Sequence, residues 1–296
     1  MHSEYAFTQM KKQKVLMTGS HGFVGTNLIT ALSEKYEIVR WNVYLNEPIP
    51  DVDAVIHLAG LAHDTKHTTE TQEYFRVNTD LTEKIYDRFL ESSAKKFFFF
   101  SSIKAQDGDT PYAKSKKAAE EYILSKRDDS KQVYILRPCM IHGPGNKGNL
   151  NLLYGVVKKG IPWPLAAFRN KRSFASIGNV SYIVDRLLYL DVESGIYNIC
   201  DDEAISTNEL IGLISECLGK EVHLWRIPKG LMSGLARLGD VFHLPLNTER
   251  LGKLTEDYIV DNSKIEYALG VETLPVNAKD GFKHTIQSMI NDNGNG

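Results

Sequence analysis

A tyrosine and a lysine four residues apart are the clearest candidates for chemistry in this sequence. Tyr112 and Lys116 form a YxxxK pattern at the start of Tyr112–Lys126, a stretch predicted to be helical. Residues four apart share one face of a helix, so the ammonium group of Lys116 can lie near the Tyr112 ring. A positive charge there favours tyrosinate and lowers a pKa that is otherwise about 10. The pattern predicts that Tyr112 is a general acid/base.

A strand-end serine comes before this pair. Ser102 follows a run of aromatic residues that predicts a buried strand, and Tyr112 comes ten residues later. The serine hydroxyl can hydrogen-bond a substrate oxygen whose proton Tyr112 gives or takes, while a hydride moves to or from a nicotinamide ring. Tyr and Lys at this spacing are also common as a surface pair. The interpretation therefore depends on a dinucleotide site elsewhere in the chain.

Glycines recur at every third position after the first predicted strand. The strand Lys14–Thr18 runs into Gly19, Gly22 and Gly25, and a predicted helix begins at Phe23. Gly19 can make a tight turn, Gly22 can let the backbone approach a pyrophosphate, and Gly25 can let the helix lie close on the strand. The first N–H groups of the helix can bind the anion. The motif predicts dinucleotide binding; the alternative is a glycine turn that serves packing alone.

The choice between NAD and NADP stays open. About 20 residues beyond the glycines, a carboxylate is typical of NAD sites, whereas a nearby arginine can accept the 2′-phosphate of NADP. This sequence has Arg40 and Asn42 there. Asn42 can bind a ribose hydroxyl, and Arg40 can pair with a phosphate or be a solvated charge at the end of a strand. The predicted cofactor is NAD or NADP.

The elements that would position these groups alternate between strands and helices, which predicts βαβ units. The strands are predicted at Lys14–Thr18, Glu37–Val43, Ala54–Leu58, Lys96–Ser101 and Val133–Arg137, and the helices at Phe23–Glu34, Thr71–Ser92 and Tyr112–Lys126. The four aromatics Phe97–Phe100 indicate a strand covered on both faces. Residues 44–53, with two prolines, are too few for a crossover helix. The prediction is an α/β fold with a trimmed, Rossmann-type doubly wound parallel sheet.

The pattern changes after Pro138 to loops, helices and short strands. The helices are predicted at Asn149–Lys159, Val180–Leu190, Thr207–Leu218 and Val276–Ile290, and the strands at Ile196–Ile199 and Glu221–Trp225. Residues 11–148 are predicted to form the dinucleotide-binding Rossmann domain. Residues 149–291 are predicted to form a smaller mixed substrate-binding part, interleaved with the first, and residues 292–296 a flexible tail.

Composition narrows the possible functions. The 296 residues are 42% hydrophobic, enough for a substantial core. The chain has 35 Lys and Arg and 37 Asp and Glu, so it has no net positive charge, which disfavours nucleic-acid binding. Cys139, Cys200 and Cys217 form no CxxC pair, so we expect reduced thiols in a cytoplasmic protein. There is no apolar run of roughly 18 residues and no signal-peptide pattern, so no membrane association is expected.

Together these segments resemble the extended short-chain dehydrogenase/reductases, in the NAD-dependent epimerase/dehydratase family and its nucleotide-sugar branch. The likeness extends over nearly the whole chain. It is carried by TGSHGFVG (Thr18–Gly25), DAVIHLAG (Asp53–Gly60), VNTDLTEKI (Val77–Ile85), FFFFSSIKA (Phe97–Ala105), YAKSK (Tyr112–Lys116), LRPCMIHGPG (Leu136–Gly145) and RSF (Arg172–Phe174).

The resemblance implies roles for individual residues. The catalytic residues are Ser102, Tyr112 and Lys116. The cofactor-binding residues are Gly19, Gly22, Phe23, Val24, Gly25, Arg40, Asn42, Leu58, Ala59, Gly60, Asn78, Ser101, Tyr112, Lys116 and Pro138. The residues for a nucleotide-diphosphate sugar, which the resemblance implies is UDP-linked, are Ser102, Ile103, Asn149, Arg172, Phe174 and Arg250. A helix N-cap at Asn149 and surface ion pairs at the arginines are the alternatives. A homodimer through Thr71–Ser92 and Tyr112–Lys126 is also implied.

The departures from the family pattern limit the reaction. Dehydratases of the family have Asp-Glu after the catalytic hydroxyl residue, whereas Ser102 is followed here by Ile103 and Lys104, which disfavours 4,6-dehydration. A 4-epimerase of a UDP-hexose or UDP-N-acetylhexosamine and a reductase of a 4-keto-6-deoxy sugar both remain. A non-catalytic dinucleotide-binding regulator and a dehydrogenase of steroid-like carbonyls are disfavoured. His63 and His67 lack a third ligand, so no metal is expected.

Overall fold

The computed structural model describes residues 12–43, 47–61, 70–146, 150–242, 244 and 246–294. They divide into two compact units, Met1–Ser101 with Ala105–Ile135, and Ser102–Lys104 with Leu136–Gly296. The two units are therefore interleaved in sequence, because residues 102–104 belong to the second. The division near residue 135 comes before the boundary that we expected at residue 148.

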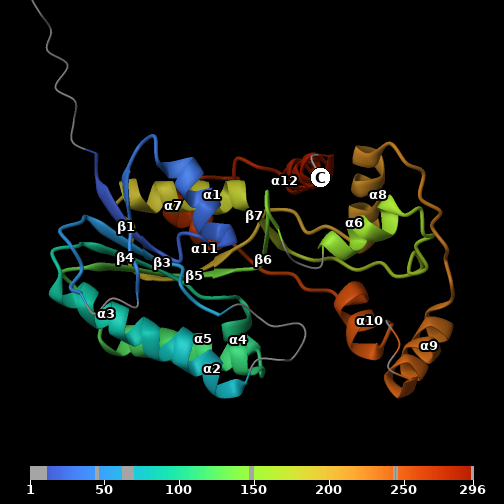
Figure 1. Cartoon of the computed structure of the whole chain (residues 1–296), viewed down its shortest axis with the longest axis horizontal. Helices are drawn as coiled ribbons and strands as arrows, with labels where there is room; N and C mark the ends of the chain where they lie inside the picture. Colours follow the sequence, from blue (N-terminus) through green and yellow to red (C-terminus); the bar gives the residue numbers. More distant parts are fainter. Residues whose placement is uncertain are drawn as a thin grey trace, which may run out of the picture. The chain divides into compact units, whose positions relative to one another are not determined.

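A six-stranded sheet has the order β2-β1-β3-β4-β5-β8 (Figure 1). Its strands are β1 Lys14–Thr18, β2 Glu37–Arg40, β3 Ala54–His57, β4 Lys96–Phe100, β5 Gln132–Pro138 and β8 Gly195–Ile199. Strand β1 pairs in parallel with β2 on one side and β3 on the other. In doubly wound sheets, ligands bind beyond the carboxyl ends of the strands where the strand order reverses, which here are β1 and β3. The parallel Rossmann-type sheet confirms the predicted fold class.

Strand β4 is buried on both faces, as its aromatic run predicts. Phe97, Phe98 and Phe99 are all 0% exposed. The Phe97 ring contacts Tyr86 and Phe89, with ring centroids 5.1 and 5.0 Å apart, while the next residue, Phe98, contacts Tyr134 of β5. Successive side chains of a strand point to opposite faces, so each face receives its own aromatic cover.

The helices of the first unit cover both faces of its strands. Helix α1 (Phe23–Leu32) lies on one face, and α2 (Thr71–Phe75), α3 (Leu81–Glu91) and α5 (Pro111–Ser125) lie on the other (Figure 1). The expected helix over Thr71–Ser92 contains a π-helical turn, η1, at Arg76–Asp80. A short helix, α4 (Lys104–Asp107), was not predicted. Strand β2 ends at Arg40 rather than Val43. The described residues between β2 and β3 contain no helix, which confirms the prediction that this connection is too short for a crossover helix.

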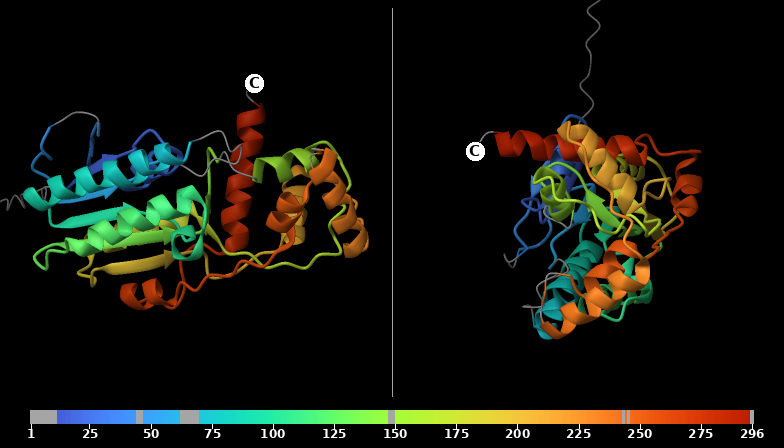
Figure 2. Two further views of the ribbon diagram at one scale, coloured as in Figure 1. Left: turned by 90° about the horizontal axis from the view of Figure 1, so that it is seen from below. Right: turned by 90° about the vertical axis from the view of Figure 1, so that its right-hand side faces the viewer.

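The second unit combines helices with a two-stranded parallel ribbon of β6 and β7. Its elements are β6 Met140–His142, α6 Leu150–Lys158, β7 Phe174–Ser176, α7 Ile177–Tyr189, α8 Thr207–Leu218, α9 Lys229–Phe242, α10 Thr248–Thr255, α11 Ser263–Leu269 and α12 Ala278–Gly294. Helices α8 and α12 pack against each other (Figure 2). Leu210, Ile214, Phe282 and Ile286 lie in their shared core. None of the helices in the described ranges is long and apolar enough to cross a membrane.

Several expectations for this unit were wrong. The segment Glu221–Trp225 is not a strand, because it makes only isolated bridges, with Trp163 pairing to Leu224. The short strands β6 and β7 and the helices α9, α10 and α11 were not predicted. Helix α12 extends to Gly294, into the residues 292–296 that we expected to be a tail. The polar residues near its C-terminus do not end the helix, because its buried face, which includes Phe282 and Ile286, packs in the core.

Candidate functional site

The glycine turn after β1 requires glycine at its first position. Gly19 has a φ of +66°, and a Cβ there would lie 2.6 Å from the nitrogen of Ala59 and 2.8 Å from the carbonyl carbon of Leu58. The N–H of Gly22 donates to the Gly19 carbonyl at 3.0 Å and closes the turn. The turn therefore packs directly on the backbone that follows β3, at the reversal point of the sheet.

The other two glycines lie where α1 begins. A Cβ on Gly25 would lie 2.5 Å from the Gly19 carbonyl oxygen. We had expected Gly25 to pack against the strand, but it packs against the turn itself. A Cβ on Gly22 would meet only that same oxygen, at 3.3 Å. The first intrahelical bond runs from Thr26 to Gly22. The N–H groups of Phe23, Val24 and Gly25 precede it, a position where backbone N–H groups can bind an anion, and the first turn contains no acidic residue.

A buried histidine links the ends of β1 and β3. The Thr18 hydroxyl accepts hydrogen bonds from the amides of Leu58 and Ala59 and lies 2.8 Å from Nδ1 of His57. His57 Nε2 lies 3.0 Å from the Thr82 hydroxyl, which donates to the Asn78 carbonyl. These bonds fit one tautomer: Thr18 donates to Nδ1, and Nε2–H donates to Thr82. Burial, assisted by the charge of Lys116, lowers the His57 pKa to about 3, so the ring is neutral.

Asn78, in the π-helical turn, holds the segment after β3. Its Oδ1 accepts from the Leu61 N–H at 2.7 Å, and its Nδ2 donates to the Leu61 carbonyl and to the Ser115 hydroxyl, each at 3.1 Å. Both hydrogens of Nδ2 are thus used within the protein. Asn78 therefore positions residues 58–61 relative to α5. Its predicted contribution to cofactor binding is indirect, because it acts by holding these residues in place.

Lys116 lies buried at the carboxyl end of β4. Its Nζ donates to the Phe100 carbonyl at 2.8 Å and lies 4.9 Å from the Phe99 ring centre. A Cβ added to Gly60 would lie 3.2 Å from the same nitrogen. Burial lowers the Lys116 pKa to about 8, against the opposing effect of Glu120. The ammonium group is therefore held at the strand ends where the glycine turn and the segment after β3 meet.

Glu120 is a site residue that sequence reasoning missed. It is 2% exposed, lies one turn after Lys116 on α5, and accepts a hydrogen bond from the Ser101 hydroxyl. Its i, i+4 spacing from Lys116 was the only available signal, and that spacing is common on helix surfaces. The Ser101 hydroxyl is thereby committed to Glu120.

Tyr112 lies in the first turn of α5, as its pattern predicts. The helix begins with Pro111 in its first turn and with Thr110 as N-cap, whose hydroxyl accepts the Ala113 N–H at 3.2 Å. The half-buried Tyr112 ring meets Tyr74 edge-on, with centroids 6.1 Å apart. Its lowered pKa stays a prediction.

The residues after β4 are fixed within the second unit. The Ile103 N–H donates to the Pro138 carbonyl at 3.0 Å, and the Lys104 N–H lies 3.3 Å from the Ser102 hydroxyl oxygen. Ser102 and Ile103 are both buried. The turn thus presents Ser102 beside the end of β5.

The charges of Lys104, Arg172 and Lys253 in the second unit influence one another, and the Lys253 ammonium group also forms an ion pair with Glu249. Arg172 Nη1 donates to the Lys253 carbonyl at 2.6 Å, and its guanidinium carbon lies 5.8 Å from the Tyr258 ring centre. Burial lowers the Lys104 pKa, and the charges of Lys253 and Arg172 lower it further. Among the described residues, neither Lys104 nor Arg172 has an ion pair with a carboxylate. This cluster can attract an anionic ligand.

The remaining predicted residues are not all placed at a site. Phe174 is buried in the core against Phe282, 5.0 Å between centroids, so its ring is used in packing. Arg250 is exposed in the first turn of α10. Arg40, the last residue of β2, and Asn42, two residues later, are exposed. The predicted residues Asn149, His63 and His67 lie outside the described residues.

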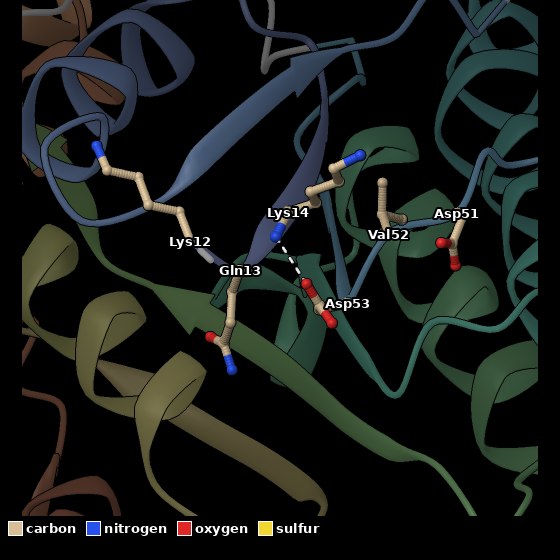
Figure 3. Close-up of a pocket in the computed structure, with 6 residues that line it drawn as sticks. All are labelled: Lys12, Gln13, Lys14, Asp51, Val52 and Asp53. Atoms are coloured by element: carbon tan, nitrogen blue, oxygen red, sulfur yellow. Dashed lines mark hydrogen bonds between the residues drawn. The ribbon is translucent and has the colours of Figure 1, made fainter. Parts of the chain in front are cut away.

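A shallow hollow lies at the opposite end of the strands. It is lined by Lys12, Gln13, Lys14, Asp51, Val52 and Asp53 (Figure 3). The Lys14 N–H donates to the Asp53 carboxylate at 2.7 Å. These residues lie before β3 and before or at the start of β1, whereas ligands of parallel sheets bind beyond the carboxyl ends of the strands. We assign this hollow no part in the chemistry.

Residues 15–200 match the model of the NAD dependent epimerase/dehydratase family. The chain belongs to this family. It is 30% identical over 324 residues to a UDP-glucose 4-epimerase of Vibrio cholerae, an alignment that covers 95% of this chain and 97% of the relative. It is 25% identical, over 74% of this chain and 77% of the relative, to an N-acetyl-alpha-D-glucosaminyl-diphospho-ditrans,octacis-undecaprenol 4-epimerase of Escherichia coli O157:H7.

The fold is also found in a solved structure, "MoeE5 in complex with UDP-glucose and NAD". That structure has a TM-score of 0.72 and 20% identity, and the match covers 94% of this chain and 99% of the other. Family membership makes the chain an NAD(P)-dependent enzyme of the extended short-chain dehydrogenase/reductase type. Its cofactor is NAD or NADP.

Proposed function

We propose that this enzyme is a 4-epimerase of a UDP-linked hexose or N-acetylhexosamine. The observation that carries the proposal is Lys116, a buried ammonium group at the carboxyl ends of the strands, one helical turn after Tyr112. Burying a lysine is unfavourable because desolvation disfavours its charged form, and here the Phe100 carbonyl and the charge of Glu120 offset that cost. The Vibrio cholerae relative, similar over nearly its whole length, is named for the same reaction.

The chain's own groups fit a nicotinamide dinucleotide. The backbone of the glycine turn leaves no room for a Cβ at Gly19 or Gly25, and the amides at the start of α1 suit a pyrophosphate. We assign the segment Leu58–Gly60 to the cofactor as well, since it packs on the turn at Gly19 and on Lys116. When bound, the cofactor would take a hydride from the sugar carbon and return it to the opposite face.

The proton that accompanies the hydride is assigned to Tyr112. Its phenolate would accept the proton of the sugar hydroxyl, and the resulting phenol would give it back in the return step. With a pKa of about 8, Lys116 is mostly charged at neutral pH and favours the tyrosinate. Ser102, whose position is fixed through Lys104 and Ile103, is assigned to hydrogen-bond the sugar oxygen.

Dehydration of the sugar is disfavoured by the residues that follow Ser102. Ile103 is 7% exposed, and neither its side chain nor the ammonium group of Lys104 is a carboxyl acid or base. A reductase of a 4-keto sugar is the second candidate. It is favoured by Arg40, exposed at the end of β2, where a cation suits the 2′-phosphate of NADP.

The test is an assay of the purified chain without added cofactor. UDP-glucose, UDP-galactose and their N-acetyl forms are each incubated with the protein and analysed for epimers, with Tyr112→Phe as the inactive control. Epimers formed by the wild type alone support the proposal. Absence of epimers, together with consumption of NADPH when a UDP-linked 4-keto-6-deoxy sugar is supplied, shows a reductase instead. A homodimer remains our expectation, which light scattering of the same sample tests.

A further inference from the structure

Helix α9 carries a row of exposed apolar side chains on one face. Leu231, Leu235, Leu238 and Phe242 are 57%, 45%, 52% and 67% exposed. Their spacing of four, three and four residues places them along a single stripe of the helix. We call these four residues the α9 stripe. Single exposed leucines are ordinary, but a continuous stripe of large apolar residues marks a surface that binds something.

The stripe is held outward by an adjacent face of the same helix. Met232, Ala236 and Gly239 are buried, and they too lie three and four residues apart. A Cβ on Gly239 would overlap the Leu246 carbonyl, so the helix packs tightly against the segment that leads into α10. Because this second face anchors α9 within its unit, the stripe cannot turn inward without breaking that packing.

The charged residues around the stripe are mostly basic. From Val222 to Phe242, the end of α9, the chain contains three exposed cations, Arg226, Lys229 and Arg237, and one acidic residue, Asp240, whose carboxylate accepts the Thr248 N–H. The whole chain has a formal charge of −2, so this positive segment is a local feature. Trp225, just before the helix, is also 54% exposed. Leucine, phenylalanine and tryptophan bordered by lysine and arginine form the pattern of helices that lie in the plane of a membrane interface.

The charge also disfavours the main alternative, a second copy of this chain. Two copies meeting through the α9 stripe would bring the basic residues of both together, and like charges repel. An anionic lipid surface instead attracts each of them, by about 1 kcal/mol per Lys or Arg near the surface.

We propose that α9 docks this enzyme on a membrane surface that contains anionic phospholipids. The stripe enters the headgroup region, while Arg226, Lys229 and Arg237 contact lipid phosphates. The inference goes beyond the proposed function and does not depend on it. It also revises the sequence-based expectation of no membrane association, which considered only membrane-spanning segments and signal peptides.

The test is flotation of the purified full chain with vesicles. One vesicle set contains phosphatidylcholine alone, and the other contains phosphatidylcholine with phosphatidylglycerol. The variant Leu235→Glu/Leu238→Glu places two charges in the stripe. Its control, Tyr267→Glu, adds a charge in place of a 90% exposed aromatic residue on α11, which packs against α7 and β8. Circular dichroism and NAD(P) affinity confirm that both variants are folded.

We expect the wild type and Tyr267→Glu to float with the phosphatidylglycerol vesicles, less so at high salt. The stripe variant should show a partition coefficient at least ~10-fold lower, because a charge in the interface removes the favourable burial. Three results would overturn the proposal. They are equal flotation of the stripe variant, no preference of the wild type for anionic vesicles, and a wild-type dimer that does not bind vesicles and that the stripe variant splits into monomers.

Discussion

The close packing of the glycine turn on the segment after β3 can be tested by two matched substitutions. Gly19 and Gly270 have nearly the same backbone conformation, with φ of +66° and +67°. A Cβ on Gly19 would lie 2.6 Å from the Ala59 nitrogen, whereas a Cβ on Gly270 would have no atom within 4 Å. Comparing Gly19→Ala with Gly270→Ala therefore separates the effect of close approach from the effect of the left-handed backbone.

The expected difference follows from two free-energy terms. Alanine in the left-handed region costs about 1–2 kcal/mol, and the reduced freedom of the unfolded chain affects both variants alike. Gly19→Ala carries in addition the cost of overpacking against immobile backbone, about 1–3 kcal/mol. We expect Gly270→Ala to lower the free energy of unfolding by about 1–2 kcal/mol and Gly19→Ala by roughly 2–5 kcal/mol.

The assays are urea denaturation, followed by circular dichroism, and titration of NAD and NADP at a temperature where both variants are folded. Gly19→Ala should also weaken dinucleotide binding, since the turn must move away from Leu58 and Ala59, whereas Gly270→Ala should leave it unchanged. Equal losses of stability in the two variants, or unaltered dinucleotide affinity in Gly19→Ala, would refute the assigned role of the turn.

Three further predictions concern the groups at the site. Tyr112→Phe should lower kcat by a factor of roughly 10²–10⁴ and leave NAD(P) affinity nearly intact; a fully active variant would remove Tyr112 from the mechanism. His57 has a pKa lowered from 6.5 to about 3 by burial, so the unfolded chain binds a proton that the folded chain does not, and stability should fall as the pH drops from about 6.5 toward 3. That dependence should weaken in His57→Gln, as measured by urea denaturation across this range. Lys104→Gln should weaken binding of UDP and reduce its salt dependence, measured by calorimetry, because the cation cluster loses one charge; an unchanged affinity would show that the cluster binds no phosphate.

Much of the first unit could be predicted because its signals are local. The strand β1, the glycine turn and the start of α1 are adjacent in the chain, and Tyr112 and Lys116 share one helix. The parallel order of the strands followed from crossover lengths. The second unit was harder, since β6 and β7 have three residues each and pair with each other across a long insertion. Runs that short carry no periodicity.

The two buried cysteines show what the sequence left hidden. Cys139 and Cys200 were interpreted as isolated thiols because they lie far apart in the chain. In the structure both are free and buried, and a hydrogen bond between their thiols raises the Cys139 pKa, with burial adding to the effect. The Cys139 N–H donates to the carbonyl of Ile199, the residue before Cys200, which explains why the two meet.

The sequence by itself determined the family, the parallel α/β framework and the residues that can turn, bind an anion or transfer a proton, since each of these is written in neighbouring positions. Tertiary structure alone decided the partners of those residues. It joined Thr18 to His57, Ser101 to Glu120, and Arg172 to the backbone of Lys253. The physical reason is that periodicity reports which face of its own element a side chain occupies. Which group it meets there depends on how distant elements pack, and that packing sets burial, charge and proton affinity.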